Sequence, residues 1–177
     1  MKKQLLIFPT IIFFFTLLIF FYLLTIERDP SKLPSALIGK KIPIFETTSL
    51  FDNKTFISTK QFGEETTLVN FFATWCMPCR NEHRYLKRLS NEKGIKIIGI
   101  NYKDDPNKAV EWLEELGNPY SDVIVDSKGL IGIDWGVYGI PETYIVNSKG
   151  IIKYRLVGSI TKKNYNAFYS KIEGIKD

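Results

Sequence analysis

A run of 22 residues without a charge, from Leu5 to Ile26, divides the chain of 177 residues into an apolar segment and a polar remainder. A helix rises about 1.5 Å per residue, so this run is long enough to cross the roughly 30 Å hydrocarbon core of a bilayer. Such a length and composition are typical of a membrane-spanning helix. The run therefore predicts a transmembrane anchor over residues 5–26, with residues 1–4 before it.

The charges on either side of the run predict its orientation. Lys2 and Lys3 precede it, and the sequence ERD follows at residues 27–29. By the positive-inside rule, the N-terminus is cytoplasmic and everything after Ile26 lies on the far side of the membrane. A cleaved signal peptide is the alternative, but its apolar region would be shorter and would end in small residues, whereas this run ends in YLLTI. The sequence therefore favours a retained anchor.

The charge of the exported part argues against a nucleic acid partner. The whole chain has 24 basic and 19 acidic residues, and residues 1–26 hold two of the lysines and no acid, which leaves a net charge of +3 for the rest. So weak and mixed a charge is typical of a solvated surface. Residues 27–40 combine two prolines and a glycine with polar residues and are interpreted as a tether. Residues 41–177 then have the length of one domain.

The pattern of residues 41–177 predicts an α/β fold. Two continuous apolar runs, TLVNFFA at 67–73 and IKIIGI at 95–100, are typical of central strands buried on both faces. Helical spacing of apolar residues follows each run, at 81–91 and at 107–116. The other expected elements are an early hairpin (42–47 and 55–58), a short strand (123–125), a late hairpin (143–146 and 151–157) and a last helix (161–172). This order predicts a mixed sheet with helices on both faces.

The chain has two cysteines, Cys76 and Cys79, and a single histidine, His83, which is expected on a helix surface. Two cysteines cannot build a multi-bridge framework, and a structural zinc site usually needs four cysteine or histidine ligands. Covalent haem attachment would need a histidine directly after the second cysteine, where Arg80 stands. An inert structural disulfide is the open alternative, although so short a loop removes little chain entropy. The pair is therefore interpreted as a redox-active dithiol that needs neither a metal nor a diffusible cofactor.

The segment WCMPCR at 75–80 directly follows the first apolar strand and opens a helix. Free N–H groups and the helix dipole at that end stabilise a thiolate, which is the nucleophile of disulfide exchange. Positions i and i+3 of a helix are neighbours, so the two cysteines can form a disulfide after a small adjustment. Cys76 is therefore the predicted attacking thiol and Cys79 the predicted resolving thiol. Trp75 is expected to cover one side of the pair.

A second signal lies in GVYGIPET at 136–143, where Pro141 stands immediately before a predicted strand. An X–Pro bond can be cis at modest cost, and a cis bond here would expose the backbone of Ile140 for pairing with an extended substrate. A proline before a strand is also common as simple punctuation, and composition alone does not decide between the two interpretations. Tyr138 is a weaker candidate for the same substrate groove.

Taken together, these segments resemble a known family. A WCxxC before a helix and a proline before a late strand are similar to the thioredoxin superfamily. The resemblance to the DsbE/CcmG thiol:disulfide interchange proteins of cytochrome c maturation is closer and covers nearly the whole chain. It is carried by SALIGKKIP at 35–43, FFATWCMPCRNEHRYLKRLS at 71–90, IGINYKDDPNKAVEWLEELGNPY at 98–120 and GVYGIPETYIVNSKGIIKYRLVG at 136–158. It implies a thioredoxin-like mixed sheet flanked by helices, with an N-terminal hairpin extension and a single N-terminal transmembrane helix.

The resemblance also implies roles for particular residues. Cys76 and Cys79 would be the attacking and resolving thiols, and Pro141 would be the cis-proline of the family. Glu82 and Glu142 align with acidic residues that line the family's active site, where a carboxylate could raise a thiol pKa and carry its proton. From the residues alone, each glutamate is more simply a solvated surface charge.

The function that the resemblance implies is reduction of the disulfide of apocytochrome c, or of a maturation partner that holds it, before haem attachment. The domain would lie in the periplasm on the bacterial inner membrane, and a membrane thiol reductant drawing on cytoplasmic thioredoxin would reduce it again. The direction of electron flow comes from the resemblance, not from the residues. Two alternatives stay open: a general periplasmic thiol-disulfide oxidoreductase, and a non-enzymatic thioredoxin-like holder of apocytochrome.

Overall fold

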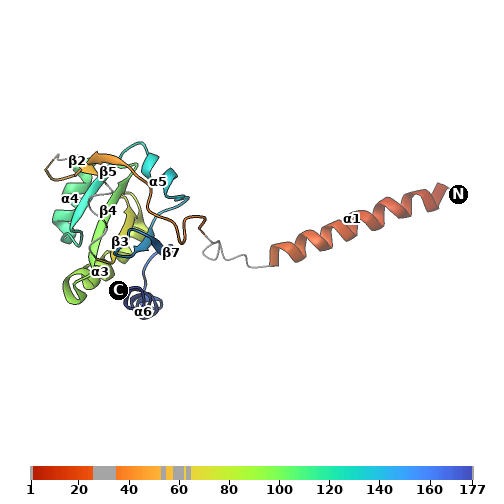
Figure 1. Ribbon diagram of the computed structural model, residues 1–177. Coiled ribbons are helices and arrows are strands. Elements are labelled where there is room, and N and C mark those ends of the chain that lie inside the picture. Colours follow the sequence, from red (N-terminus) through yellow and green to blue (C-terminus); the bar gives the residue numbers. More distant parts are fainter. Residues whose placement is uncertain (1, 26–34, 53–54, 58–61, 63–64, 177) are drawn as a thin grey trace. The chain divides into compact units, whose positions relative to one another are not determined.

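The computed structural model describes residues 2–25, 35–52, 55–57, 62 and 65–176, which fall into two compact units, Met1–Leu33 and Pro34–Asp177 (Figure 1).

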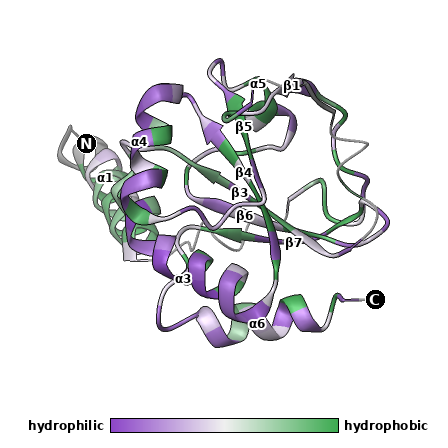
Figure 2. Cartoon of the chain, turned by 90° about the vertical axis from the view of Figure 1, so that its left-hand side faces the viewer, coloured by the Kyte–Doolittle hydropathy of each residue, from purple (hydrophilic) through white to green (hydrophobic). Residues whose placement is uncertain are grey.

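The first unit consists of the helix α1 (Lys2–Thr25). Its stretch Ile7–Thr25 has 19 residues and is long and apolar enough to cross a membrane, although a signal sequence near the N-terminus would meet the same criteria. Figure 2 shows the helix green, and so hydrophobic, along most of its length. Thr16 satisfies its hydroxyl within the helix by donating to the carbonyl of Ile12, at 2.7 Å. The single apolar helix that the sequence predicted is therefore present.

A five-stranded sheet forms the centre of the second unit. Its strands are β3 (Thr67–Phe72), β4 (Lys96–Tyr102), β5 (Asp122–Asp126), β6 (Glu142–Val146) and β7 (Ile152–Val157). Their order across the sheet is β5-β4-β3-β6-β7. Strands β3, β4 and β5 are parallel, whereas β6 is antiparallel to β3 and β7 is antiparallel to β6.

Helices cover both faces of this sheet (Figure 1). One face shares a hydrophobic cluster with α3 (Met77–Lys93), α4 (Pro106–Leu116) and α6 (Tyr165–Glu173), and the opposite face packs against the short α5 (Leu130–Asp134). The mixed sheet with helices on both faces, predicted from the sequence, is confirmed.

The limits of α3 follow from its terminal residues. Cys76 caps its N-terminus, and Pro78 stands in the first turn, where a missing N–H is harmless. Gly94 ends the helix in the left-handed region, with φ 62°, and its N–H donates to the carbonyl of Ser90. The helix therefore starts ahead of the periodic stretch 81–91, as expected from the segment WCMPCR that opens it.

Alternation along β3 assigns its side chains to the two faces of the sheet. Leu68 and Phe72 pack toward α3, α4 and α6, whereas Val69 and Phe71 belong to the cluster on the other face. Asn70 alternates with Val69 and Phe71, so its polar side chain points to the same face as Leu68 and Phe72, the face covered by α3, α4 and α6. That position makes Asn70 the first sign of a buried polar site.

The predicted early hairpin is present as β1 (Glu46–Thr48) paired antiparallel with β2 (Thr55–Ile57). Residues 53, 54 and 58 of the predicted turn and strand lie outside the described residues. The hairpin is joined to the edge of the main sheet, where the Leu50 N–H donates to the carbonyl of Val123 at 2.7 Å. It therefore lies at the β5 edge as a separate two-stranded sheet.

Two further differences from the sequence prediction have physical causes. Residues 35–40 of the predicted tether pack on the domain, since the Gly39 N–H donates to the carbonyl of Ile152 at 2.8 Å, so the folded unit begins earlier than predicted. Residues 27–34 lie outside the described part of the chain. The helix α5 was not predicted, because five residues are too few to show a helical period. Its N-terminal N–H groups are capped by the buried carboxyl group of Asp126.

The substitution Gly99→Ala is expected to destabilise the folded domain by about 1–3 kcal/mol, because a Cβ on Gly99 would lie 2.9 Å from Phe72 Cε1 and 3.0 Å from Tyr120 Cγ. Urea unfolding of the detergent-solubilised chain, followed by near-ultraviolet circular dichroism, measures the loss. Gly139→Ala is the control: a Cβ on Gly139 would meet no atom within 4 Å, so the free energy of unfolding of this variant should change little. Equal effects of the two substitutions would contradict the packing described.

Candidate active site

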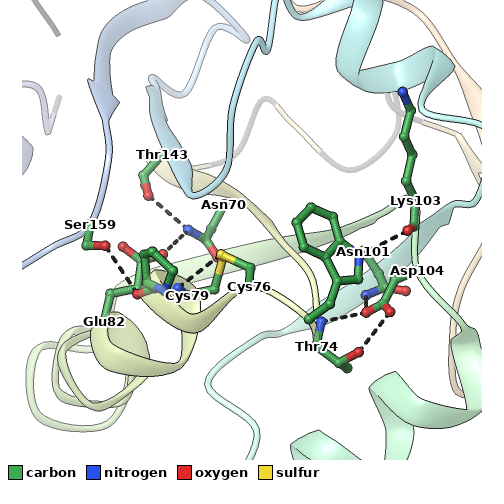
Figure 3. Close-up of a disulfide and its surroundings, with 12 residues drawn as sticks. Asn70, Thr74, Cys76, Cys79, Glu82, Asn101, Lys103, Asp104, Thr143 and Ser159 are labelled. Carbon is green, nitrogen blue, oxygen red and sulfur yellow. Dashed lines mark hydrogen bonds between the residues drawn. A yellow bond between two sulfur atoms is a disulfide. The ribbon is translucent and has the colours of Figure 1, made fainter. Parts of the chain in front are cut away.

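The disulfide between Cys76 and Cys79 lies where the chain passes from β3 into α3 (Figure 3). The two Cα atoms are 5.3 Å apart, and the side chains are 4% and 1% exposed. The Sγ atom of Cys76 accepts a hydrogen bond from the Cys79 backbone N–H at 3.1 Å. The predicted attacking sulfur therefore lies on the free N–H groups of a helix N-terminus, which favour negative charge.

The turn at Thr74, which leads into the disulfide, is held by the loop after β4 (Figure 3). The carboxylate of Asp104 accepts hydrogen bonds from Thr74 N at 2.7 Å, Thr74 Oγ1 at 2.8 Å and Asn101 Nδ2 at 2.8 Å. The indole Nε1 of Trp75 donates to the carbonyl of Lys103 at 3.1 Å. The Trp75 ring is nevertheless 61% exposed, so it offers an apolar surface next to the cysteines in the sequence.

One helical turn beyond Cys79, the carboxyl group of Glu82 is fully buried. Its Oε1 accepts a hydrogen bond from Asn70 Nδ2 at 2.9 Å, and its Oε2 accepts one from the Ile160 backbone N–H at 2.8 Å. Asn70 Nδ2 also donates to Thr143 Oγ1 at 3.0 Å. The Glu82 carboxyl group on α3 is thus bound from β3 and from the segment before α6, and β6 joins the network through Asn70 (Figure 3).

Burial determines the protonation of this carboxyl group. Desolvation raises the pKa of Glu82 from 4.5 to about 8, although the hydrogen bonds from Ile160 and Asn70 oppose the rise. Tyr120 completes the network by donating its hydroxyl to Asn70 Oδ1 at 2.9 Å, and burial together with Glu82 holds its own pKa well above the usual value. The network is therefore largely uncharged at neutral pH, and Glu82 can exchange a proton near pH 8.

The loop before β6 contains the predicted substrate-binding residues. The Ile140–Pro141 peptide bond is cis, and the carbonyl of Pro141 accepts a hydrogen bond from the Gly158 N–H at 2.9 Å. Ile140 is half-buried and packs against the hydrophobic cluster that contains both cysteines. Tyr138 is exposed, with the Arg155 guanidinium 4.7 Å from its ring centroid. The structure thus brings this loop to the cluster that holds the disulfide.

Glu142 is buried, but its carboxylate belongs to the opposite face of the sheet from Glu82. It accepts hydrogen bonds from Arg155 Nε at 2.7 Å and Nη2 at 2.8 Å, and from the hydroxyl of Tyr144 at 3.0 Å. Arg155 Nη2 also donates to the carbonyl of Gly136 at 3.2 Å. A buried ion pair of this kind fixes the 136–141 loop. The geometry therefore favours a structural part for Glu142 over the proton-carrying role that the resemblance implied.

The prediction that His83 lies on the helix surface is wrong. His83 is 3% exposed, its Nε2 lies 2.7 Å from the carbonyl of Gly117, and its ring meets Trp112 edge-on at 4.5 Å between centroids. Burial lowers the pKa of His83. The buried face of α3 is wider than the apolar residues alone indicate, because it includes Glu82 and His83.

Three polar residues of the network, Asn70, Tyr120 and Thr143, were not singled out from the sequence. Asn70 carried a signal, since it interrupts an otherwise apolar run in a central strand. Tyr120 and Thr143 carried none that distinguishes them from core and strand residues. Their contacts with Asn70 depend on residues 50 and 73 positions away along the chain, which only the fold brings together.

The chemistry of the site follows from these groups. In the part of the chain that the structure describes, there is no cluster of three or more histidine, cysteine or acidic side chains able to hold a metal ion. The site offers two sulfurs that interconvert between disulfide and dithiol, and a neighbouring carboxyl group that titrates near pH 8. This arrangement on this sheet defines a thiol-disulfide oxidoreductase with a thioredoxin-like fold.

Comparisons with known proteins agree with this class. The Redoxin family matches residues 37–169. The thiol:disulfide interchange protein DsbE of Haemophilus influenzae is 46% identical over 168 residues, which cover 92% of this chain and 91% of the relative. DsbE of Escherichia coli K12 is 42% identical over 167 residues, which cover 92% of this chain and 90% of that relative. The chain therefore belongs to the DsbE thiol:disulfide interchange proteins of the Redoxin family.

A solved structure supports the fold independently. The crystal structure of a secreted thiol-disulfide isomerase from Corynebacterium glutamicum superposes with a TM-score of 0.65 and covers 82% of this chain and 95% of its own. Its sequence identity is 18%, so this likeness concerns the fold alone.

The substitution Glu82→Gln is expected to remove a pH dependence from the stability of the oxidised protein. Between about pH 4.5 and about pH 8, the unfolded chain releases the Glu82 proton while the folded protein keeps it, so stability falls as pH rises and is constant above that range. The fall amounts to a few kcal/mol, because one pKa unit corresponds to about 1.4 kcal/mol. Urea unfolding at a series of pH values measures it. A variant with the same slope as the wild type would contradict the raised pKa.

Proposed function

We propose that this oxidoreductase is anchored in the bacterial inner membrane and reduces the disulfide of apocytochrome c, or of a maturation partner that holds it, before haem is attached. The observation that carries the redox part is the buried Cys76–Cys79 disulfide at the N-terminus of α3. The restriction to cytochrome c maturation is supported by the resemblance of four sequence segments to the DsbE/CcmG proteins and by the identity with relatives named DsbE.

The proposed reaction starts from the reduced dithiol. The Cys76 thiolate, favoured by the N–H groups at its helix terminus, attacks one sulfur of the substrate disulfide and displaces the other as a thiolate. The Cys79 thiol then loses its proton, and its sulfur bonds to Cys76 while the mixed disulfide breaks. The substrate gains two electrons and leaves as a dithiol, and the protein keeps the Cys76–Cys79 disulfide.

Glu82 is the proposed acceptor of the Cys79 proton. The two residues are one turn apart on the buried face of α3, where positions i and i+3 are neighbours. Both side chains are withdrawn from water, so a nearby group must take the proton. A carboxyl group with a pKa of about 8 can accept a proton from a thiol without a large free-energy difference.

The substrate is proposed to lie along the surface formed by Trp75, Tyr138, Ile140 and Pro141. Trp75 and Tyr138 are large and exposed, and Ile140 packs against the cluster of the cysteines. An extended, unfolded polypeptide suits such a surface, because it can offer backbone and apolar side chains together. Glu142 contributes by holding the loop through Arg155.

The anchor is proposed to be α1, with residues 1–4 in the cytoplasm and 5–26 in the membrane. Of the predicted tether 27–40, residues 27–34 would link the anchor to the domain, and residues 35–177 would form the domain that carries the chemistry in the periplasm. The length and apolar composition of Ile7–Thr25 support a membrane-spanning helix. A membrane thiol reductant would return two electrons to the disulfide after each turnover. Neither step needs a diffusible cofactor.

The substitution Cys79→Ala is expected to trap the substrate, because the mixed disulfide at Cys76 then has no resolving thiol. Non-reducing gels and mass spectrometry of the purified full-length chain would identify the partner, expected to be apocytochrome c or a maturation protein. Cys76→Ala/Cys79→Ala is the matched control and should trap nothing. Capture of unrelated exported proteins would favour a general oxidoreductase, and failure to trap any thiol protein would count against the redox role.

In the cell, the substitution Cys76→Ala is expected to abolish mature c-type cytochromes while other exported disulfides stay unchanged. Without the attacking thiol, the haem-binding cysteines of apocytochrome would remain oxidised. Haem-stained gels and thiol labelling of exported proteins measure the two effects. Normal cytochrome levels in this variant and in the double cysteine variant would leave a non-enzymatic holder as the better explanation.

A further inference from the structure

Tyr120 contacts the active-site network from outside β3 and α3, the elements that carry Asn70 and Glu82. It lies between α4 and β5, is 7% exposed, and stacks on Phe72 with 4.9 Å between ring centroids. Its backbone N–H donates a hydrogen bond to Asn118 Oδ1 at 2.9 Å. The ring is thus fixed in the core with its hydroxyl directed at Asn70.

Tyr120 can approach Asn70 because residue 99, beside it on β4, is a glycine. In the sheet register, Asn70 stands opposite Gly99 on β4 and opposite Thr143 on β6. A Cβ on Gly99 would lie 3.0 Å from Tyr120 Cγ, so the ring occupies the space that a side chain on β4 would fill. Asn70 therefore has Thr143 on one side and the Tyr120 ring on the other.

The hydrogen bond from Tyr120 determines which way the Asn70 amide faces. An amide has one oxygen and one NH2 group, and here the Oδ1 accepts from Tyr120 while the Nδ2 donates to Glu82 and to Thr143. In the flipped amide, the oxygen would face the oxygens of the ionised Glu82, acceptor against acceptor. The Tyr120 hydroxyl would then also lose its acceptor inside the core, where an unsatisfied donor is costly.

We propose that Tyr120 is a positioning residue of the redox site: its hydroxyl orients the Asn70 amide so that an N–H group points at the Glu82 carboxyl beside Cys79. The inference rests on the proposed role of Glu82 as acceptor of the Cys79 proton. As Cys79 Sγ bonds to Cys76 Sγ, the Cys79 proton passes to Glu82, and the released substrate thiolate takes a proton from water. The N–H of Asn70 stabilises the ionised Glu82 that must be present before this transfer.

The groups around Glu82 support an effect that acts through Asn70. Among the described residues, Tyr120 interacts electrostatically with Glu82, Cys79 lies one turn before it on α3, and His83, next in sequence, has its Nε2 at the carbonyl of Gly117. The hydrogen bonds to Glu82 come from Asn70 and from the Ile160 N–H. The Asn70 contact is therefore one of two that favour the ionised form, and Tyr120 acts on it directly.

The test is a titration of Glu82 in the oxidised, full-length, detergent-solubilised chain labelled with carboxyl-13C glutamate. Infrared spectra over a pH series report the protonated carboxyl, and the band missing in Glu82→Gln assigns it. Tyr120→Phe should raise the pKa of Glu82 by about half a unit, because a polarising donor is lost from the chain of hydrogen bonds. Asn70→Ala should raise it by about one to two units, because a bond to the charged form itself is lost.

Tyr165→Phe is the matched control. Tyr165 belongs to the same hydrophobic cluster and is 4% exposed, but its hydroxyl has no hydrogen-bond partner in the described part of the structure. Its removal should leave the Glu82 titration unchanged. A Tyr120→Phe chain that titrates like the wild type would overturn the proposal, and so would an equal shift in Tyr165→Phe, which would indicate a general effect of core packing.

A kinetic measurement links the titration to the reaction. With a disulfide-bonded CxxC peptide as the probe, the rate at which the reduced chain resolves its mixed disulfide should depend on pH, with a midpoint displaced upward in Tyr120→Phe and not in Tyr165→Phe. An unchanged midpoint would overturn the positioning role even if the titration shifted. Neither readout depends on the cellular substrate, so normal cytochrome levels in Cys76→Ala would contradict the proposed function and leave this inference standing.

Discussion

The burial of the Glu82 carboxyl group constrains the residues around the disulfide. A carboxylate inside a protein needs a cation or several donors, and Glu82 has two N–H donors, from Asn70 and Ile160. Asn70 must then be a polar residue within an apolar central strand, and it needs partners of its own in Tyr120 and Thr143. The sheet, the helix α3 and the segment before α6 are thus joined at one polar point.

The strand β6 separates two carboxyl groups that the resemblance had placed in one site. Successive side chains of β6 point to opposite faces. Thr143 points to the face covered by α3, α4 and α6, where Glu82 lies, and Glu142 points to the other face, where it pairs with Arg155. One carboxyl group is held without a cation and titrates within the physiological range, whereas the other is locked in an ion pair. The same residue type is therefore largely uncharged at neutral pH on one face and paired with a cation on the other.

The sequence was sufficient for the elements that carry a local pattern. Continuous apolar runs identified β3 and β4, and the CxxC at the start of a helix identified Cys76 and Cys79. The short α5 and the buried place of His83 could not be predicted, because the first has no helical period and the second depends on the neighbouring α4. The Tyr120–Asn70 contact joins residues 50 positions apart, so it required the strand order and the gap at Gly99.

The hydrogen bonds that hold the turn before the disulfide separate the placement of Cys76 from the make-up of the exposed surface beside it. Asp104 holds Thr74, and Lys103 holds Trp75, so the approach to Cys76 is set from the side of β4. Met77, between the cysteines, is 67% exposed. Because none of these hydrogen bonds involves Met77, a substitution at this position would alter the surface beside the disulfide and leave the approach to Cys76 in place. The backbone that leads to the nucleophile is thus fixed independently of the exposed side chain that follows it.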